Sequence, residues 1–352
     1  MTLAVVILAA GQGTRMLSKK QKILHAVGGK PMVQHAFDAA TAVASIPPVM
    51  VVGNGEAGVR GLLGEQATYV TQAEQLGTGH ATKMAAPVLQ SNVDQVIVTY
   101  GDMPLLRSET LERLSDKQAK TNASVVLLSV MGDIESSFGR VVRDQHGHGD
   151  VLEIVEVAEA RQRPNTAELL AIRELNAGVY CFDADWLWQN IDTLPVRQAR
   201  SGQEFYLTDM VEIAVAQGRL VEAIATDDPD ECLGAGTRRE LAVVEKAFRR
   251  RANLRWLDRG VTIIDPDFTY IDQDVVIGRD TIIWPNAYLQ GKTSIGEDCK
   301  IGPNVVIRDA QIGDGCHIEQ SVVENVTVAN ETRLRPFSVV TNELSLLDAR
   351  VY

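Results

Sequence analysis

The chain has 352 residues, of which 45% are hydrophobic and 23% are charged. This length allows two domains, and this composition is ordinary for a soluble globular protein. The net charge of -12 provides no general attraction to nucleic acid, so no nucleic-acid partner is expected. The four cysteines lie far apart without a Cys-x-x-Cys pair, which argues against a zinc site or a disulfide framework and fits a reducing cytoplasm. No apolar run is long enough to cross a membrane and no signal peptide is recognised, so we expect a cytoplasmic protein without a membrane partner.

The first two-thirds of the chain alternates predicted strands with helical patterns. Near-continuous apolar runs predict buried strands at residues 3–8, 49–52, 96–100, 125–130 and 179–182. Such runs are typical of a largely parallel sheet that is covered on both faces. A helix is expected to begin at Pro31, and its apolar stripe consists of Met32, Val33, Ala36, Phe37 and Ala40. The sequence therefore predicts an α/β domain over residues 1–236.

The first predicted strand runs directly into the glycine-rich segment 8–16 (LAAGQGTRM), which is followed by Lys22. A strand that passes through such a turn into a helix presents backbone N–H groups to an anion, and Arg15 and Lys22 add positive charge. The dinucleotide fingerprint is excluded, because Met16 stands at its third glycine and residues 28–37 carry no acid. The ATP/GTP phosphate loop is absent as well. For the Gly-x-Gly pair alone, a plain tight turn is the alternative.

Two further motifs combine polar side chains with turn positions. Asp102 follows the predicted strand 96–100, and a carboxylate at the carboxyl end of a strand can hold Mg²⁺ against a triphosphate. The alternative for Asp102 is a helix-capping or turn aspartate. Residues 72–80 (QAEQLGTGH) combine amide and hydroxyl groups with glycine backbone, which can read the edge of a base. The alternative there is a polar loop before a helix that starts near His80.

A long helix is predicted over residues 238–257, with Gly260 as its terminator. Its apolar side is expected to consist broadly of Leu241, Val244, Phe248 and Leu257. Its basic cluster is expected to be a solvated face, formed by Arg249, Arg250, Arg251 and Arg255. We place the domain linker at residues 237–260.

Beyond Gly260, aliphatic residues recur at intervals of six. The regular series is Ile271, Ile277, Ile283, Leu289, Ile295, Ile301 and Ile307. The register then slips but continues through Ile312, Ile318, Val323, Val328, Leu334 and Val340. A period of six fits neither a helix nor a series of simple hairpins, and it is the hexapeptide signature of a parallel β-helix. Residues 261–352 are therefore predicted to form a short β-helix of roughly four coils, with these side chains pointing inward.

These motifs resemble a known family. The segment 8–16 with Lys22 is similar to the signature of sugar-1-phosphate nucleotidylyltransferases. Together with segments 72–80 and 100–102 and the hexapeptides, it resembles the bacterial bifunctional N-acetylglucosamine-1-phosphate uridylyltransferase/glucosamine-1-phosphate acetyltransferases, over nearly all of the chain up to about Pro336. The resemblance implies a Rossmann-like nucleotidylyltransferase domain followed by a left-handed β-helix. It also implies Mg²⁺ as cofactor, UTP and a sugar-1-phosphate as substrates, UDP-N-acetylglucosamine and pyrophosphate as products, and a homotrimer assembled through the β-helix.

The resemblance also implies roles for individual residues. The nucleotide would be bound by Leu8, Ala9, Ala10, Gly11, Gln72, Gly77, Thr78, Tyr100 and Gly101. Arg15 and Lys22 would face phosphate as the catalytic residues, and Asp102 would bind the metal. The sugar would be bound by Gly139, Glu156, Asn176 and Thr208. The sugar phosphate would attack the α-phosphorus of UTP directly, so His25 and His35 are expected to pack rather than to react.

The sequence departs from the family pattern in three places. Residues 20–22 (KQK) stand where the family has Leu-Pro-Lys, and Gly236 stands where it has an asparagine metal ligand. Water, Thr237 or an acid at positions 227, 228 or 230 would have to substitute for that ligand. After Arg333 and Arg335 the sequence leaves the acetyltransferase pattern, so no acetyltransferase activity is expected. The alternatives left open are a nucleotidylyltransferase for another base or sugar and a non-catalytic nucleotide-sugar-binding assembly subunit.

Overall fold

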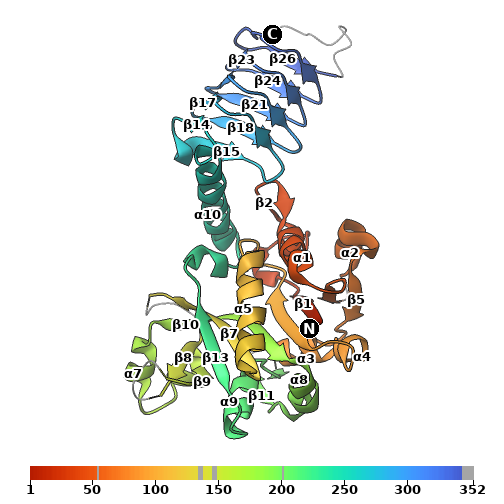
Figure 1. Cartoon of the computed structure of the whole chain (residues 1–352), viewed down its shortest axis with the longest axis vertical. Helices are drawn as coiled ribbons and strands as arrows, with labels where there is room; N and C mark the ends of the chain where they lie inside the picture. Colours follow the sequence, from red (N-terminus) through yellow and green to blue (C-terminus); the bar gives the residue numbers. More distant parts are fainter. Residues whose placement is uncertain (54, 134–137, 145–148, 200–201, 343–352) are drawn as a thin grey trace. The chain divides into compact units, whose positions relative to one another are not determined.

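A computed structural model describes residues 1–53, 55–133, 138–144, 149–199 and 202–342 of the chain. The chain divides into two compact units (Figure 1). The first consists of Met1–His25 and Pro31–Leu241, and the second of Ala26–Lys30 together with the chain from Ala242 onward. None of the described helices is both long and apolar enough to cross a membrane. All four cysteines are buried and free.

The first unit is built on a nine-stranded mixed sheet. Its main path runs in the order β13 (Val221–Ala225), β7 (Val125–Met131), β10 (Glu174–Asp183), β6 (Gln95–Tyr100), β1 (Leu3–Ala9), β4 (Val49–Val52) and β5 (Thr68–Thr71). Strand β10 is antiparallel to both of its neighbours, whereas the other pairs along this path are parallel. The hairpin β8 (Arg140–Arg143) and β9 (Val151–Val155) extends from β10. The predicted mainly parallel sheet is therefore confirmed, with β10 as the antiparallel strand of its main path.

Short elements connect these strands. The helices of the first unit are α1 (Met32–Val43), α2 (Ala57–Leu63), α3 (Thr78–Lys83), α4 (Ala86–Leu89), α5 (Ser108–Thr121), α6 (Val157–Ala160), α7 (Thr166–Ala171), α8 (Ala184–Asn190) and α9 (Asp209–Ala216). Its 3-10 turns are η1 (Thr14–Met16), η2 (Lys22–Leu24), η3 (Gly64–Gln66), η4 (Ile191–Thr193) and η5 (Pro229–Cys232). Strands β11 (Arg197–Ala199) and β12 (Gly202–Glu204) form a small two-stranded sheet in this unit. The small two-stranded sheet of β2 (Ala26–Val27) and β3 (Lys30–Pro31) belongs mainly to the second unit.

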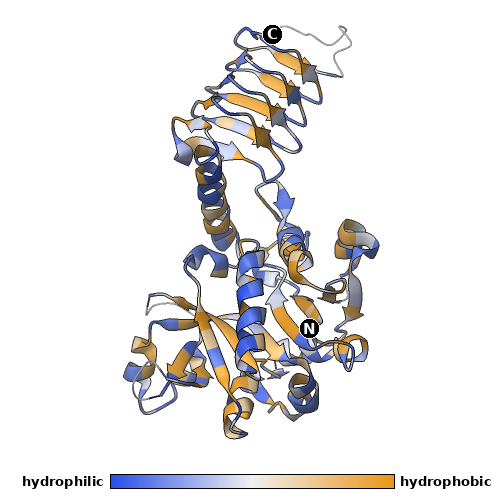
Figure 2. Cartoon of the chain, viewed as in Figure 1, coloured by the Kyte–Doolittle hydropathy of each residue, from blue (hydrophilic) through white to orange (hydrophobic). Residues whose placement is uncertain are grey.

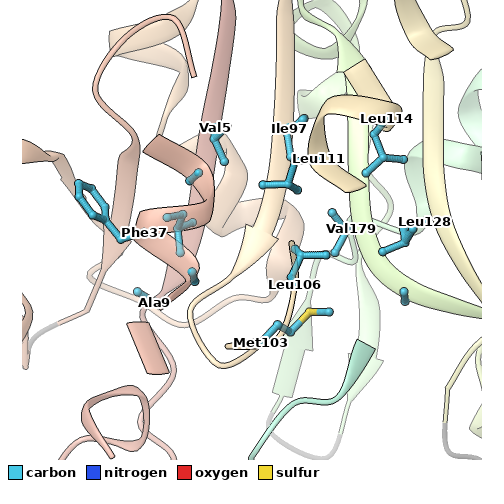
Figure 3. Packing of buried hydrophobic residues seen from close by; sticks show 14 of the residues in the cluster. Val5, Ala9, Phe37, Ile97, Met103, Leu106, Leu111, Leu114, Leu128 and Val179 are labelled. Atoms are coloured by element: carbon cyan, nitrogen blue, oxygen red, sulfur yellow. The ribbon is translucent and has the colours of Figure 1, made fainter. Parts of the chain in front are cut away.

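Strand β1 illustrates how the sheet is buried on both faces. Successive side chains of a strand point to opposite faces, so alternate residues enter different cores. Leu3, Val5, Ile7 and Ala9 join one core with side chains of α1 and α5 (Figure 3). Ala4 and Val6 join the other core with side chains of α3, α8 and α9. The predicted stripe of α1 is confirmed, because its five residues are all buried.

The long helix α10 (Arg238–Leu257) has the predicted bounds, but its faces differ from the expectation. Leu257 is 37% exposed, and the buried residues are Val244, Ala247, Phe248, Ala252, Asn253 and Trp256. The Arg249 guanidinium stacks 4.7 Å from the centroid of the Tyr270 ring, and that of Arg255 lies 5.2 Å from the Trp256 ring. The expectation of a solvated face is therefore wrong for these two arginines, because nearby rings cover them.

The second unit consists mainly of a parallel β-helix with three sheets. Their orders are β14-β17-β20-β23, β15-β18-β21-β24-β26 and β16-β19-β22-β25. The strands are β14 (Thr262–Ile263), β15 (Thr269–Ile271), β16 (Val276–Ile277), β17 (Ile282–Ile283), β18 (Ala287–Gln290), β19 (Ser294–Ile295), β20 (Lys300–Ile301), β21 (Val305–Arg308), β22 (Gln311–Ile312), β23 (His317–Ile318), β24 (Val322–Glu324), β25 (Thr327–Val328) and β26 (Val339–Thr341). The turn η6 (Pro266–Phe268) precedes β15. This architecture agrees with the left-handed hexapeptide coil that the resemblance implies.

The six-residue repeat places one aliphatic side chain inside each side of a coil. The repeat residues from Ile271 to Val328 are all buried, whereas Leu334 and Val340 are only partly buried. The strands of the β-helix are accordingly hydrophobic in Figure 2. The pairs Ile277↔Ile295, Ile295↔Ile312 and Ile312↔Val328 lie in register, so successive turns of this sheet shorten from 18 to 17 to 16 residues. The slip seen in the sequence is thus a shortening of the coils.

Candidate active site

The glycine-rich segment after β1 approaches Lys22 closely. Gly13 leads into η1 with a φ of +64°, a conformation that glycine adopts at little cost. A Cβ atom on Gly13 would lie only 2.4 Å from Cβ of Lys22. The second glycine of the turn therefore provides both the backbone conformation and the space for Lys22, which begins η2.

Asp102 lies beside this turn, because β1 and β6 are parallel neighbours that end together. Leu8 pairs with Tyr100, and the backbone N–H of Gly101 donates to the carbonyl of Leu8 at 3.0 Å. The Lys22 Nζ atom lies 2.5 Å from Oδ2 of Asp102, and both side chains are largely buried. Ligands were predicted to bind at the carboxyl ends of these strands. At this edge of the sheet the structure brings together the glycine-rich turn after β1, the Lys22 ammonium group and the Asp102 carboxylate.

The segment 72–80 lies against the same turn. The buried Gln72 donates through Nε2 to the Gly77 carbonyl at 3.1 Å, and the same atom lies 3.0 Å from Nδ1 of His80. Gln75 donates through Nε2 to the Ala10 carbonyl at 2.5 Å. Two glutamine amides are therefore held in place by the loop itself and by the turn after β1.

These segments line an open cavity of about 430 Å³. The predicted residues that line it are Leu8, Ala9, Ala10, Gly11, Lys22, Gln72, Gly77, Thr78, Tyr100 and Asp102. We call it the nucleotide cavity. Arg15 and Gly101 are not among its lining residues: Gly101 is buried against Leu8, and Arg15 is exposed on η1.

A second cavity of about 700 Å³ adjoins the first, and Thr78, Tyr100 and Tyr206 line both. We call it the sugar cavity. The other predicted residues in its wall are Glu156, Asn176 and Thr208. Gly139 lies behind this wall, where its carbonyl accepts from the Asn176 N–H at 2.8 Å and a Cβ on it would lie 3.1 Å from Oε1 of Glu156. Gly139 therefore supports the wall without lining it.

The polar groups of the sugar cavity differ in how firmly they are held. The Asn176 side chain donates to the Tyr180 hydroxyl at 2.7 Å and accepts from the Gly178 N–H at 3.0 Å, so its amide is fixed. The Glu156 carboxyl makes no hydrogen bond with any described residue. Burial, followed by the charges of Glu159 and Asp209, raises the pKa of Glu156. An unpartnered carboxyl of this kind is suited to accept hydrogen bonds from sugar hydroxyl or amide groups.

Several residues of the sugar cavity were not predicted from the sequence, among them Tyr206, Arg197 and Gln198. Arg197 belongs to strand β11 and forms a paired contact with Asp209, with Nε–Oδ2 at 3.1 Å and Nη2–Oδ1 at 2.8 Å. No spacing rule reveals such a pair. Tyr206 stands two positions before Thr208, which was predicted as a sugar-site residue. The position of Tyr206 in this short motif could therefore have indicated that it also belongs to the site.

A metal ion in the nucleotide cavity would have the Asp102 carboxylate as an oxygen ligand. Among the residues that the structure describes, no three or more His, Cys, Asp or Glu side chains converge as a metal site. Mg²⁺ is commonly held by one or two carboxylates with phosphate oxygens and water, so Asp102 fits an ion that arrives with a nucleotide. Two of the side chains named as substitutes for the ligand missing at Gly236 have other partners: Asp227 pairs with Arg113, and the Thr237 hydroxyl accepts from the Glu240 N–H.

The buried His25 contacts the start of α10. Its Nδ1 lies 3.3 Å from Nη1 of Arg238. Burial, and then the charges of Arg238 and Lys20, lower the pKa of His25. A neutral, buried imidazole in this place agrees with the expected packing role.

The sequence was next compared with known proteins. The MobA-like NTP transferase domain matches residues 5–230, and the bacterial transferase hexapeptide (six repeats) matches residues 274–309. The chain is 43% identical over 333 residues to the "Bifunctional protein GlmU" of Geobacillus sp. (strain WCH70), which covers 95% of this chain and 71% of that protein. The chain belongs to the GlmU family. The GlmU of Heliobacterium modesticaldum is 40% identical over 344 residues, covering 98% of this chain and 73% of its own length.

Membership of the GlmU family confirms the resemblance, and with it a nucleotidyltransferase unit followed by hexapeptide coils. A solved structure of UDP-glucose pyrophosphorylase complexed with UDP-glucose has a TM-score of 0.55 over 71% of this chain and 100% of that chain. At 16% identity, this likeness shows a shared fold.

Proposed function

We propose that this GlmU-family nucleotidyltransferase joins UTP and N-acetylglucosamine-1-phosphate, giving UDP-N-acetylglucosamine and pyrophosphate. The observation that carries the proposal is the pair of adjoining cavities, since a transfer between two substrates requires their reacting groups to meet. The nucleotide cavity holds the phosphate-type turn with Lys22, and the sugar cavity holds Glu156 and Asn176. Gln72, Gly77 and Thr78 would contact uracil, and Thr208, with Gly139 behind it, would complete the sugar site.

The chemistry needs no nucleophilic side chain. An oxygen of the sugar-1-phosphate forms a bond to the α-phosphorus of UTP, while the bond to the β-phosphate oxygen breaks and pyrophosphate leaves with the electron pair. The attacking phosphate is already anionic near neutral pH. The protein's part is to align the two phosphates and to neutralise charge through Lys22, Arg15 and the N–H groups of the turn after β1.

We propose that the reaction depends on Mg²⁺, held on the protein by Asp102 and completed by phosphate oxygens and water. The ion would neutralise charge on the phosphate oxygens. Lys22, which is paired with Asp102 in this structure, would then be positioned next to the same phosphates. We further propose that the chain assembles as a homotrimer through its hexapeptide coils; sedimentation analysis should then give three times the 38.4 kDa of one chain.

The deciding experiment is a pyrophosphate-release assay with UTP, Mg²⁺ and a panel of sugar-1-phosphates, repeated with dTTP, CTP and GTP. Turnover that is greatest with UTP and N-acetylglucosamine-1-phosphate is the expected result. Preference for another pair would replace the substrate assignment. Binding of UDP-N-acetylglucosamine by calorimetry without any turnover, in folded protein, would instead identify a nucleotide-sugar-binding subunit.

A further inference from the structure

The Gln72 side chain is held in one orientation beside the nucleotide cavity. It is 4% exposed, and its Nε2 atom lies 3.1 Å from the carbonyl oxygen of Gly77. A carbonyl oxygen can only accept a hydrogen bond, so the amide nitrogen of Gln72, and not its oxygen, must face Gly77. The same carbonyl accepts from the Ala81 N–H at 3.1 Å, which fixes it at the start of α3.

His80, on α3, provides the second partner of this amide. Its Nδ1 atom lies 3.0 Å from Nε2 of Gln72. An amide nitrogen donates and does not accept, so Nδ1 must accept here, and the neutral imidazole must carry its proton on Nε2. The Gly77 carbonyl and Nδ1 of His80 therefore take up both hydrogens of the Gln72 amide. An amide turned the other way would set its oxygen against two acceptors.

Oε1 is the hydrogen-bonding atom of Gln72 that remains. It makes no hydrogen bond with any residue in the described part of the chain. Gln72 lines the nucleotide cavity and an adjoining cavity of about 300 Å³, and the two also share Ala10 and Gln75. The Gln72 side chain therefore offers a ligand in this region an acceptor and no donor.

Pyrimidine bases differ in what they present to a fixed acceptor. Uracil and thymine carry a hydrogen on N3, whereas N3 of cytosine has only a lone pair. A fixed amide oxygen can accept from the N3–H of uracil or thymine, but it meets another acceptor on cytosine. Buried polar groups that are left unpaired penalise the wrong ligand. An amide that could turn over would present its nitrogen and accommodate cytosine as well.

We propose that His80 is a positioning residue for base selection. By accepting from Nε2 of Gln72, its Nδ1 atom stops the amide from turning over and keeps Oε1 available to the N3–H of a uracil-type base. The inference rests on the proposed function, because it takes Gln72 as a contact of the base. It extends that function by naming a residue through which the site discriminates uracil from cytosine.

The test measures the affinities for UTP, dTTP and CTP by calorimetry, with Mg²⁺ and without sugar phosphate, so that no turnover is needed. It compares the wild type with His80→Leu, His80→Asn, Gln72→Met and the double variant that combines Gln72→Met with His80→Leu. The control variant is His317→Leu, because the His317 side chain is 42% exposed on the β-helix. The dTTP measurement is an internal control, since thymine has the same N3–H as uracil.

We expect His80→Leu to weaken the binding of UTP and of dTTP by the same factor of about five to ten, the scale of one hydrogen bond, and not to weaken the binding of CTP. The preference for UTP over CTP should then fall, while the ratio of UTP to dTTP affinity stays constant. His80→Asn should keep the wild-type preference, because Oδ1 of asparagine can accept in the place of Nδ1.

The double variant should bind UTP no more weakly than Gln72→Met, since both changes act through one amide. Melting temperatures close to that of the wild type would show that the variants fold.

An equal loss of affinity for all three nucleotides in His80→Leu would overturn the inference, as would effects of the two single changes that multiply in the double variant. A wild type that binds UTP no better than CTP would overturn it as well. If the wild type turns over no substrate pair, the proposed function fails, while the ratio of UTP to CTP affinity still decides the role of His80.

Discussion

Asp102 and Lys22 form a close charge contact in the nucleotide cavity, and replacing Asp102 removes this contact together with the proposed metal ligand. In Asp102→Ala, Lys22 loses its partner at 2.5 Å and the cavity loses the carboxylate proposed to hold Mg²⁺. We expect kcat/KM to fall by roughly 100-fold or more, on the scale seen when one transition-state charge contact is removed. The measurement is kcat/KM of each variant as a function of the Mg²⁺ concentration. Asp116→Ala, on the exposed side of α5, is the control; equal rates in the two variants would refute the metal assignment.

Glu156 is predicted to make stability depend on pH. Its carboxyl has a pKa above the ordinary value of 4.5 in the folded state, so the fold binds its proton more tightly than the unfolded chain does. This group therefore favours folding at low pH and opposes it as pH rises through the folded-state pKa. Glu156→Gln should be more stable than the wild type at pH 7, and the difference should vanish below about pH 4.5. Urea unfolding at both pH values measures it.

A second readout tests the proposed sugar contact of Glu156. Glu156→Gln should raise KM for the sugar-1-phosphate and leave KM for UTP nearly unchanged, because Glu156 lines the sugar cavity and not the nucleotide cavity. A variant that is less stable at neutral pH would show that the carboxylate is stabilised there by a contact that outweighs its burial.

At the scale of elements, Gly77 sets how the loop before α3 packs. Its φ is +94°, and a Cβ on it would lie 2.5 Å from the carbonyl oxygen of Phe205. Since that neighbour is backbone, it cannot rotate away. Gly77→Ala should destabilise the unit by about 1–3 kcal/mol and raise KM for UTP, as measured by thermal unfolding and initial rates. The control is Gly61→Ala, because Gly61 on α2 has an ordinary φ and no neighbour within 4 Å of its Cβ position. A Gly77→Ala melting temperature equal to the control's would contradict the prediction.

The sequence predicted those strands whose side chains are buried on both faces. β1, β4, β6 and β7 are near-continuous apolar runs, and all four were predicted. Of β10, only the apolar part at residues 179–182 was predicted, because its first half is interrupted by polar residues and glycine. β5 and β13 lie at the ends of the main path and are mostly half-exposed, so they lack such a run. The direction of β10 depends on the path of the connections between strands. The apolar residues of a strand do not indicate its direction, so the sequence pattern could not predict it. Within the site, contiguous motifs were predicted, whereas Arg197 depends on a contact with Asp209 that only the folded chain brings together.

At the scale of the whole molecule, the hexapeptide coils provide a core of their own. Ile301 is fully buried among aliphatic residues of neighbouring coils, whereas Val276 is 58% exposed on the outer surface. Ile301→Ala should cost about 2–5 kcal/mol of unfolding free energy. Val276→Ala should change it by less than about 0.5 kcal/mol. Denaturant unfolding of the two variants measures the contrast, and similar losses would argue against an inward-facing repeat.

The nucleotide and sugar cavities have a common wall that includes Thr78 and Tyr206, and two hydrogen bonds join the segments that carry these residues. The N–H of Gly79 donates to the Phe205 carbonyl at 2.8 Å, and the Leu207 N–H donates to the Thr78 hydroxyl at 3.0 Å. A ligand that shifts one of these two segments should also move the other, so we expect the binding of the two proposed substrates to be coupled. Thermodynamic linkage then requires reciprocity: whatever factor UTP imposes on the affinity for the sugar phosphate, the sugar phosphate imposes on the affinity for UTP.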